Sequence, residues 1–265
     1  MTLKRLALLS SILVFSQIAS AQSSTSPSSE QAKRDPQAVA VVQSAISAMG
    51  GTATIALMQS SVATGTSVDQ SAQQNTPGSF TWTYAGSEFR NENNATTGSH
   101  ILISNAGSPQ DYENGSYVIL PSVAARTNRP FHIPALTLFS EIANPSYSVV
   151  YVGTAALNGI NVVHIRLRDE SDIAGQLFTL QDWYFNSTTG LPSRVQFSFP
   201  TSPQPKDSLP ETIDFSNFQP VNGILVPFQL SITLGPLDFV VTMNSVAFNT
   251  NMNPSLFTPS TGAAQ

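Results

Sequence analysis

The last third of the chain alternates apolar and small polar residues over a succession of short segments. Phe, Val and Leu recur at every second position, and turn residues such as those at 186–190 interrupt the pattern. A period of two puts successive side chains on opposite faces of a strand, so the pattern predicts an antiparallel meander with one apolar face. That face has to be buried against another layer. The expected strands are 178–185, 192–199, 211–218, 224–235 and 237–249.

The first 21 residues have the three parts of a signal peptide. Lys4 and Arg5 form a basic start, an apolar stretch follows, and Ala19 to Ala21 are the small residues of a cleavage site. We therefore expect an exported protein, periplasmic or secreted, that is soluble after cleavage. Beyond this segment the chain is Ser-rich without apolar periodicity, which predicts a disordered spacer. The expected organisation is a signal peptide over 1–21, a spacer over 22–35, a folded domain over 36–259 and a tail over 260–265.

The charge pattern excludes several classes of partner. Charged residues are 10% of the chain and the formal net charge is −5. Basic residues form no cluster larger than a pair such as Arg166 and Arg168, so nucleic acid and anionic membrane surfaces are not expected partners. The chain has no cysteine, which excludes disulfides and thiol catalysis. We expect a monomer.

Two segments have helical rather than strand periodicity. The first has Asp35 as its N-cap and Pro36 at its first position, and Gly50 follows its end. The second spans 130–144, and residues 52–58 allow one further helical turn. Each helix has one apolar stripe, which predicts that it lies on the sheet. The stripe residues are Val39, Val42, Ile46 and Met49 in the first helix and Ile133, Leu136, Leu138, Phe139 and Ile142 in the second.

The middle of the chain continues the strand pattern. Phe80, Trp82 and Tyr84 share one face of a strand, and Asn158 with Gly159 marks a hairpin turn between strands at 147–155 and 160–168. Further strands are expected at 101–104 and 117–120, with Asn- and Gly-rich loops at 91–98 and 107–115. Two or three helices then face about ten or eleven strands, which predicts an α+β, mainly β protein with a curved antiparallel sheet.

Motifs for catalysis are absent from the sequence. The histidines His100, His132 and His164 stand at no metal-ligand spacing, and neither G-x-S-x-G nor S-x-x-K occurs. We therefore expect no enzyme, no metal and no cofactor. An active site would need His132, His164 and a carboxylate such as Asp182 to converge in one cleft.

Carboxylates are the remaining titratable groups to interpret. Asp182 shares a strand face with Tyr184 and would lie inside if that face is buried, where Arg166, Arg168 or Arg194 would pair with it. The acidic run at 169–172 follows a strand and is interpreted as a solvated loop.

Four segments resemble the periplasmic lipoprotein-carrier superfamily, the LolA/LolB-like proteins. They are 48–51 (AMGG), 183–194 (WYFNSTTGLPSR), 213–227 (IDFSNFQPVNGILVP) and 246–257 (VAFNTNMNPSLF). The resemblance covers most of residues 36–259 and implies an open antiparallel half-barrel with helices on its concave side. It also implies an apolar cavity for acyl chains between the two layers. The carrier's lipoprotein-handling residues have no counterpart in these segments, so lipoprotein sorting itself is not implied.

Two functions remain open from the sequence. The first is a non-catalytic binding protein or carrier for a hydrophobic ligand, such as a lipid or a lipoprotein acyl chain. The second is an envelope sensory or protein-interaction module with a transient envelope-protein partner. An apolar void of about 300 Å³ or more between helices and sheet favours the first, and a packed interior favours the second. The side chains expected to contact the ligand are Val42, Ile46, Met49, Trp82, Leu136, Phe139, Ile142, Phe197, Phe228 and Leu230.

Overall fold

A computed structural model describes residues 32–71, 76–95, 98–105, 107–113, 116–200 and 207–258. The expected signal peptide at 1–21, the spacer residues 22–31 and the tail at 260–265 lie outside these residues. Residues from Ala32 onward belong to one compact unit. The last part of the expected spacer is ordered, because Lys33 and Asp35 exchange backbone hydrogen bonds of 2.8 Å with Val149.

The described residues contain one antiparallel sheet in the order β6-β5-β4-β3-β2-β1-β13-β12-β11-β10-β9-β8-β7. It stays open, because β6 and β7 at its two edges do not pair with each other. The expected open antiparallel half-barrel is confirmed, with thirteen strands. Their bounds are β1 (Ser60–Asp69), β2 (Gly78–Ala85), β3 (Glu88–Ala95), β4 (Gly98–Asn105), β5 (Ser108–Glu113), β6 (Ser116–Ile119), β7 (Tyr147–Leu157), β8 (Ile160–Asp169), β9 (Gln181–Asn186), β10 (Pro192–Pro200), β11 (Ser208–Val221), β12 (Ile224–Leu234) and β13 (Leu237–Phe248).

Among the described residues, two helices precede the first strand, three lie between strands and a 3₁₀ helix follows the last strand. Both main predicted helices are confirmed, and α1 begins where expected, with the Asp35 carboxylate accepting a hydrogen bond from the Gln37 backbone N–H. None of the described helices is long and apolar enough to cross a membrane. Their bounds are α1 (Pro36–Ala48), α2 (Thr52–Ile55), α3 (Ser122–Thr127), α4 (Pro134–Ala143), α5 (Ile173–Phe178) and the 3₁₀ helix η2 (Pro254–Phe257).

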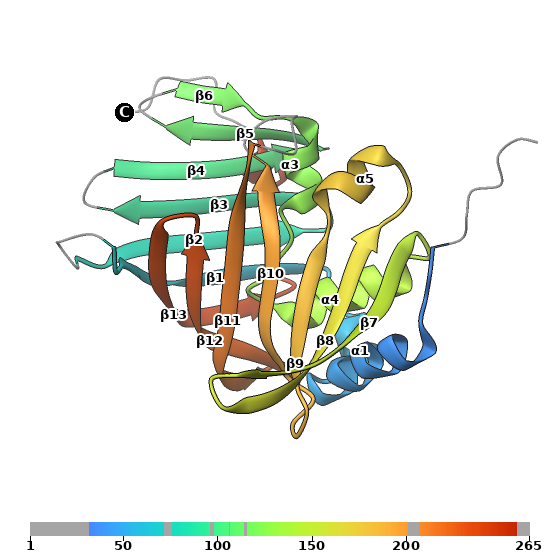
Figure 1. Cartoon of the computed structure of the whole chain (residues 1–265). Coiled ribbons are helices and arrows are strands. Elements are labelled where there is room, and N and C mark those ends of the chain that lie inside the picture. Colours follow the sequence, from blue (N-terminus) through green and yellow to red (C-terminus); the bar gives the residue numbers. More distant parts are fainter. Residues whose placement is uncertain are drawn as a thin grey trace, which may run out of the picture. The chain divides into compact units, whose positions relative to one another are not determined.

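The path of the chain explains why helices fill the concave side. The strands β1 to β6 form one half of the sheet, and the chain then passes through α3 and α4 to the opposite edge at β7. The strands β7 to β13 return until β13 pairs with β1. Figure 1 shows α4 behind β8 and β9, with α1 next to it at the β7 edge of the sheet. The helix α3 contacts β5 of one half and β10 of the other, so it bridges the two halves.

The main core lies between the sheet and the helices α1 and α4. Val42, Ile46 and Met49 of α1 are completely or almost completely buried, as the apolar stripe predicts. In α4 the fully buried apolar side chains are Ala135 and Leu138. Leu136, Phe139 and Ile142 of the predicted stripe are half-buried and pack against the same core. On the sheet, this core includes Trp183, Phe185, Val195, Ile213 and Phe215.

Two predicted loops are strands in the structure. Most of 91–98 belongs to β3 and most of 107–115 to β5. The sequence hides these strands because their faces are mostly polar and lack the apolar alternation that marks a half-buried strand. Their backbone groups are nevertheless satisfied on both sides, since β3 pairs with β2 and β4, and β5 pairs with β4 and β6.

The carboxylates occupy different environments from those expected. Asp182 lies on the outer face of β9, because the alternate positions Gln181 and Trp183 are the buried ones. Of the three arginines proposed as its partner, Arg166 pairs with it at 2.9 Å, and His164 is a second partner at 2.6 Å. The interpretation of the acidic run as solvated is wrong for Asp169, which is 6% exposed. Its carboxylate accepts hydrogen bonds from Arg126 and Ser146, and these hydrogen bonds compensate for its burial.

Candidate functional site

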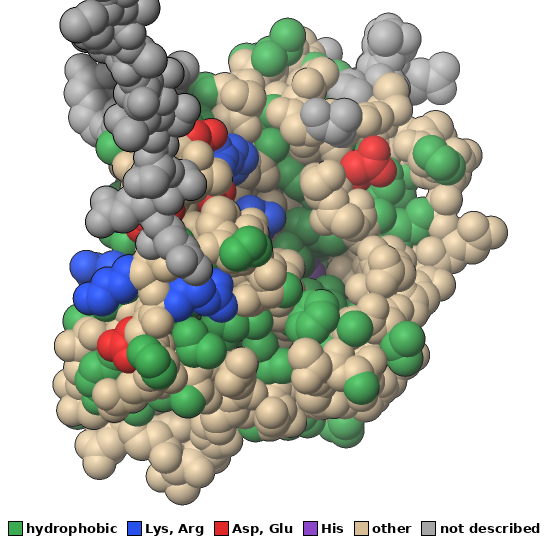
Figure 2. Space-filling view, turned by 90° about the vertical axis from the view of Figure 1, so that its right-hand side faces the viewer, with side chains coloured by type: hydrophobic (Ala, Val, Ile, Leu, Met, Phe, Trp, Pro, Cys, Tyr) green, Lys and Arg blue, Asp and Glu red, His purple; other side chains and the backbone are tan. Residues whose placement is uncertain are grey.

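A cavity of about 260 Å³ lies on the concave side of the sheet, beside the packed core. Its walls come from β2–β4 of one half of the sheet and β10–β12 of the other, and the connection between α3 and α4 supplies the rest. Figure 2 shows a hollow among hydrophobic side chains on the face at the right of Figure 1. The lining residues are Trp82, Tyr84, Asn91, Asn93, His100, Leu102, Thr127, Asn128, Arg129, Phe131, His132, Phe197, Phe199, Glu211, Ile213, Leu230, Ile232 and Leu234.

The aromatic walls are fixed by ring stacking and by a bulge in β1. Phe131 of the α3–α4 connection stacks on Phe197 of β10 with ring centroids 4.2 Å apart. Trp82 stacks on Phe80 at the same distance. Phe80 in turn lies on Gly65, where a Cβ atom would be 2.7 Å from the Phe80 ring. The bulge at Gly65 therefore positions the Trp82 wall through Phe80.

Three side chains form a hydrogen-bonded polar group on the cavity wall. The Asn91 amide donates to the Tyr84 hydroxyl at 2.8 Å, and that hydroxyl donates to Asn128 Oδ1 at 2.9 Å. The Trp82 indole N–H donates to Asn93 Oδ1 at 3.1 Å. Burial raises the pKa of Tyr84, so its hydroxyl stays protonated. The cavity therefore combines apolar walls with a neutral polar group.

Besides Tyr84, two titratable side chains on the walls have strongly shifted pKa values. His132 is 4% exposed, and its burial lowers the pKa of the imidazole to about 3. The half-buried Glu211 also loses hydration, which raises the pKa of its carboxyl to about 7. His132 is therefore neutral at physiological pH, while Glu211 is close to its titration midpoint.

A second buried polar network lies behind the cavity wall. Gln181 donates from its amide to Glu141 at 2.7 Å and accepts from the Trp183 indole at 2.8 Å. Arg129 donates to the Tyr147 hydroxyl at 3.0 Å. Burial raises the pKa of Glu141 to about 7, although the Arg129 charge and the Gln181 hydrogen bond act to lower it. This network ties α4 to β7 and β9.

The structure divides the side chains expected to contact a ligand into two groups. Trp82, Phe197 and Leu230 line the cavity. The others lie in the packed core between helices and sheet or against it: Val42, Ile46, Met49, Leu136, Phe139, Ile142 and Phe228. The helices therefore fill one part of the concave side, and the cavity occupies another.

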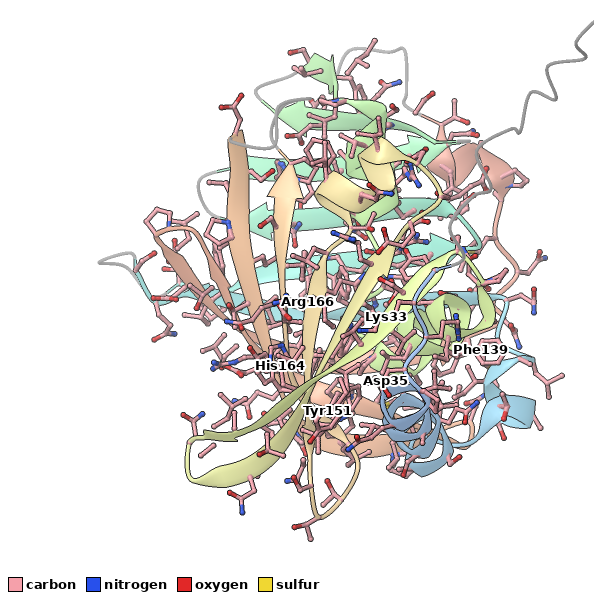
Figure 3. All side chains as sticks on the ribbon, turned by 45° about the vertical axis from the view of Figure 1, so that its right-hand side comes forward. Lys33, Asp35, Phe139, Tyr151, His164 and Arg166 are labelled. Carbon is pink, nitrogen blue, oxygen red and sulfur yellow. The ribbon has the colours of Figure 1, made fainter. Side chains whose placement is uncertain are left out.

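His132 and His164 do not converge. His132 lines the cavity, as does His100, whereas His164 lies on the outer face of β8 and contacts Asp182 at 2.6 Å. Figure 3 shows His164 and Arg166 together on β8, away from Phe139 of the helix α4. Within the described ranges, no cluster of three or more His, Cys, Asp or Glu side chains could hold a metal ion.

A second cavity, of about 240 Å³, lies at α5. Leu177 and Leu180 line it and are 52% and 38% exposed, and Ile173 of the same helix is 75% exposed. This helix contacts α3 and β10. It therefore presents an apolar surface next to the elements that frame the first cavity.

The polar residues that line the cavity were not predicted from the sequence. Asn91 lies in a segment interpreted as a loop, and Arg129 and Glu211 belong to no motif. One signal was available for the neighbouring wall, because Trp82 and Tyr84 share a strand face in the sequence. The polar residues become neighbours only through pairing of β2 with β3 and through the α3–α4 crossing.

No protein-family model matches the chain, and no curated protein matches it by sequence. Solved structures do match. A LolA superfamily protein from Nitrosomonas europaea superposes with a TM-score of 0.54 at 10% identity, covering 84% of this chain and 97% of that one. A putative outer membrane lipoprotein-sorting domain from Vibrio parahaemolyticus superposes with a TM-score of 0.52 at 13% identity, and the match covers 83% of this chain and 95% of that one. A DUF1329 family protein from Desulfovibrio piger superposes with a TM-score of 0.51 at 13% identity, and the match covers 82% of this chain and 95% of that one. At these identities the matches show that the chain has a LolA-like fold.

Proposed function

We propose that this protein is an exported, non-catalytic binding protein or carrier for a hydrophobic ligand. The observation that carries the proposal is the cavity of about 260 Å³, whose walls are mainly aromatic and aliphatic and which lies beside an already packed core. A void left by incomplete packing would lower the stability of the fold and serve no purpose, whereas a void that binds a ligand has a function. The volume is slightly below the value of about 300 Å³ expected of a carrier, so a slender ligand fits best.

The energetics of burial are sufficient for such a ligand. Transfer of one methylene from water to an apolar site contributes about 0.8 kcal/mol, so ten methylenes contribute about 8 kcal/mol. Association costs several kcal/mol, so ten methylenes alone leave an affinity on the order of millimolar, and about fifteen methylenes, which contribute about 12 kcal/mol, reach the micromolar range. The apolar walls therefore supply enough free energy without a charged anchor.

The structural neighbours support the same class of function. One of them is described as a putative outer membrane lipoprotein-sorting domain, and this chain has a similar fold. We propose that residues 36–259 form the binding domain and that it acts in the periplasm or outside the cell, after removal of residues 1–21.

The test is ligand binding by the purified protein and by a variant with a blocked cavity. A fluorescent acyl probe is titrated into wild type, Ile232→Trp and Ile119→Trp. Ile232 lines the cavity, whereas Ile119 is 78% exposed on the edge strand β6. We expect micromolar binding by wild type and Ile119→Trp, and at least a tenfold loss in Ile232→Trp, as about 1.4 kcal/mol of lost contact would give. Absence of probe uptake, together with no lipid in an organic extract of the protein, would contradict the proposal.

A sensory or protein-interaction module is the second candidate. The exposed apolar side chains Leu177 and Leu180 at the second cavity favour it, together with Ile173 of the helix α5, because clustered exposed apolar residues are typical of interaction sites. Capture of a stoichiometric envelope protein that is lost in the Ile173→Ser, Leu177→Ser double variant would support this function.

A further inference from the structure

Three cavity-lining side chains each carry a buried polar atom without a hydrogen-bond partner among the described residues. The atoms are Asn91 Oδ1, His132 Nε2 and Arg129 Nε. A buried polar atom left unpaired costs free energy, and in native proteins it generally finds a partner. In a cavity proposed to hold a ligand, the ligand is the source of such partners.

The Asn91 amide defines what its partner must be. Its Nδ2 group donates to Tyr84 at 2.8 Å and to Asn128 at 3.4 Å, which fixes the orientation of the amide. The unpaired atom is therefore the carbonyl oxygen Oδ1, which only accepts. A ligand group next to it has to donate a hydrogen. Carboxylates, ethers and esters lack such a hydrogen.

His132 offers a second hydrogen-bonding atom, which can act as a donor or as an acceptor. Its ring lies between Trp82 and Tyr84, with ring centroids 5.0 and 5.2 Å away. Because burial lowers its pKa to about 3, the ring is neutral, and Nε2 donates or accepts according to the tautomer. Tyr84 contacts both Asn91 and His132, so the two unpaired atoms belong to side chains on one part of the wall.

The charges around the cavity disfavour an ionic ligand group. Arg129 is the cation on the wall, and its charge acts on the buried carboxyl of Glu141 while its guanidinium donates to Tyr147. Glu211 on the wall opposes an anion when it is ionised. An ammonium group would be repelled by the positive charge of Arg129. A carboxylate next to Asn91 Oδ1 would place two acceptors together without a hydrogen to share. The space at the unpaired atoms is also tight, since none of them is exposed to solvent.

We infer that the ligand is an uncharged amphiphile whose polar end is a hydroxyl group. The hydroxyl donates to Asn91 Oδ1 and shares a second hydrogen bond with His132 Nε2, while the hydrocarbon chain follows Phe197, Ile213 and Leu230. A hydroxyl matches both atoms because it donates and accepts, and it is small enough to reach them after a small shift of the two side chains that keeps the Asn91 hydrogen bonds to Tyr84 and Asn128. This inference rests on the proposed function and names the ligand class of the same cavity.

The test compares ligands with the same chain and different ends. Dodecan-1-ol, dodecanoic acid at pH 7.5, dodecylamine and 1-methoxydodecane displace a fluorescent acyl probe from the full chain. The methoxy compound keeps an acceptor oxygen but has no hydrogen to donate. We expect the alcohol to displace the probe at a concentration about tenfold lower than each of the others, as one net hydrogen bond would give. His132→Phe and Asn91→Leu should each remove most of this preference.

His164→Phe is the matched control, because it makes the same substitution on the outer face of the sheet. It should keep the preference of wild type. Equal displacement by alcohol and methoxy compound, a preference for the acid or the amine, or an unchanged preference in a folded His132→Phe variant would overturn the inference while leaving the proposed function standing. Failure of every ligand and of the probe would refute the proposed function itself.

Discussion

Gly50 and Gly223 are in backbone contact where the end of α1 meets the turn between β11 and β12. A Cβ atom on Gly50 would lie 2.5 Å from the Gly223 carbonyl oxygen, and Gly50 has a φ of +132°. The adjacent backbone adds a hydrogen bond of 2.9 Å from the Leu225 N–H to the Met49 carbonyl. Two of the segments that resemble the carrier superfamily therefore meet at this point.

Gly50→Ala should destabilise the protein by about 3 kcal/mol or more, because it adds both a backbone clash and a strained φ. Unfolding in urea, followed by Trp fluorescence, measures the change. Gly86→Ala is the matched control, since Gly86 also has positive φ (+61°) but nothing within 4 Å of its Cβ position. It should cost about 1–2 kcal/mol. Equal losses in the two variants would show that the contact with Gly223 is unimportant.

Arg126 joins α3 to the loop between β8 and α5. Its guanidinium donates to Asp169 at 2.6 Å, to Asp172 at 2.7 Å and to Ser171 at 3.0 Å. Arg126→Ala should destabilise the protein by about 1–3 kcal/mol, as the loss of hydrogen bonds to a buried carboxylate predicts. Arg166→Ala removes a more exposed ion pair and should cost less than about 1 kcal/mol. Thermal and urea unfolding of both variants measure the difference.

The Arg126→Ala effect should also depend on pH. Burial of Asp169 acts to raise its pKa, but hydrogen bonds from Ser171, Ser146 and Arg126 outweigh it and hold the pKa below the ordinary value of 3.8. A depressed pKa in the folded state stabilises the protein above the unfolded pKa, and this stabilisation is lost as the pH falls. The difference between wild type and Arg126→Ala should therefore shrink below about pH 4. A difference that grows on acidification would contradict this assignment.

Because the cavity and the packed core are separate, a substitution in the core should lower stability and a substitution on the cavity wall should lower affinity. Val42 is fully buried in the core, so Val42→Ala should cost about 2 kcal/mol of stability and leave probe affinity unchanged. Phe197 is half-buried on the cavity wall, so Phe197→Ala should weaken probe binding roughly tenfold. Equal losses of affinity in the two variants would mean that the ligand also reaches the space under α1.

The layers of the fold can be predicted from the sequence better than the residues of the candidate site. The apolar stripe of α1 and the period-two meander of β9–β13 are local patterns. Both elements lie where the patterns indicate, except that Phe178, predicted at the start of a strand, ends the helix α5, and β9 begins only at Gln181. The strand β3 has no such pattern, because its stability comes from pairing with β2 and β4 and from side chains such as Asn91 that bond across strands. The fully buried residues Val42 and Met49 have the same apolar character as the cavity wall, so residue type alone does not separate core from site.

Glu141 should impose a pH dependence on stability near neutrality. Its side chain is 1% exposed, and burial raises its pKa from 4.5 to about 7, against the lowering effects of Arg129 and Gln181. A raised pKa in the folded state stabilises the protein below the unfolded pKa, and this contribution is lost as the pH rises to the folded pKa. Wild type should therefore lose stability relative to Glu141→Gln between about pH 4.5 and 7, by on the order of 3 kcal/mol.

Glutamine suits this comparison because its side-chain oxygen still accepts the hydrogen bond from Gln181. Urea unfolding of both proteins at closely spaced pH values gives the difference directly, and other titrating groups, including His132, cancel in it. A difference in unfolding free energy that stays constant from pH 4.5 to 8 would mean that Glu141 is already ionised throughout this range. The Arg129 charge would then outweigh burial, because it would hold the carboxylate in its charged form within the core.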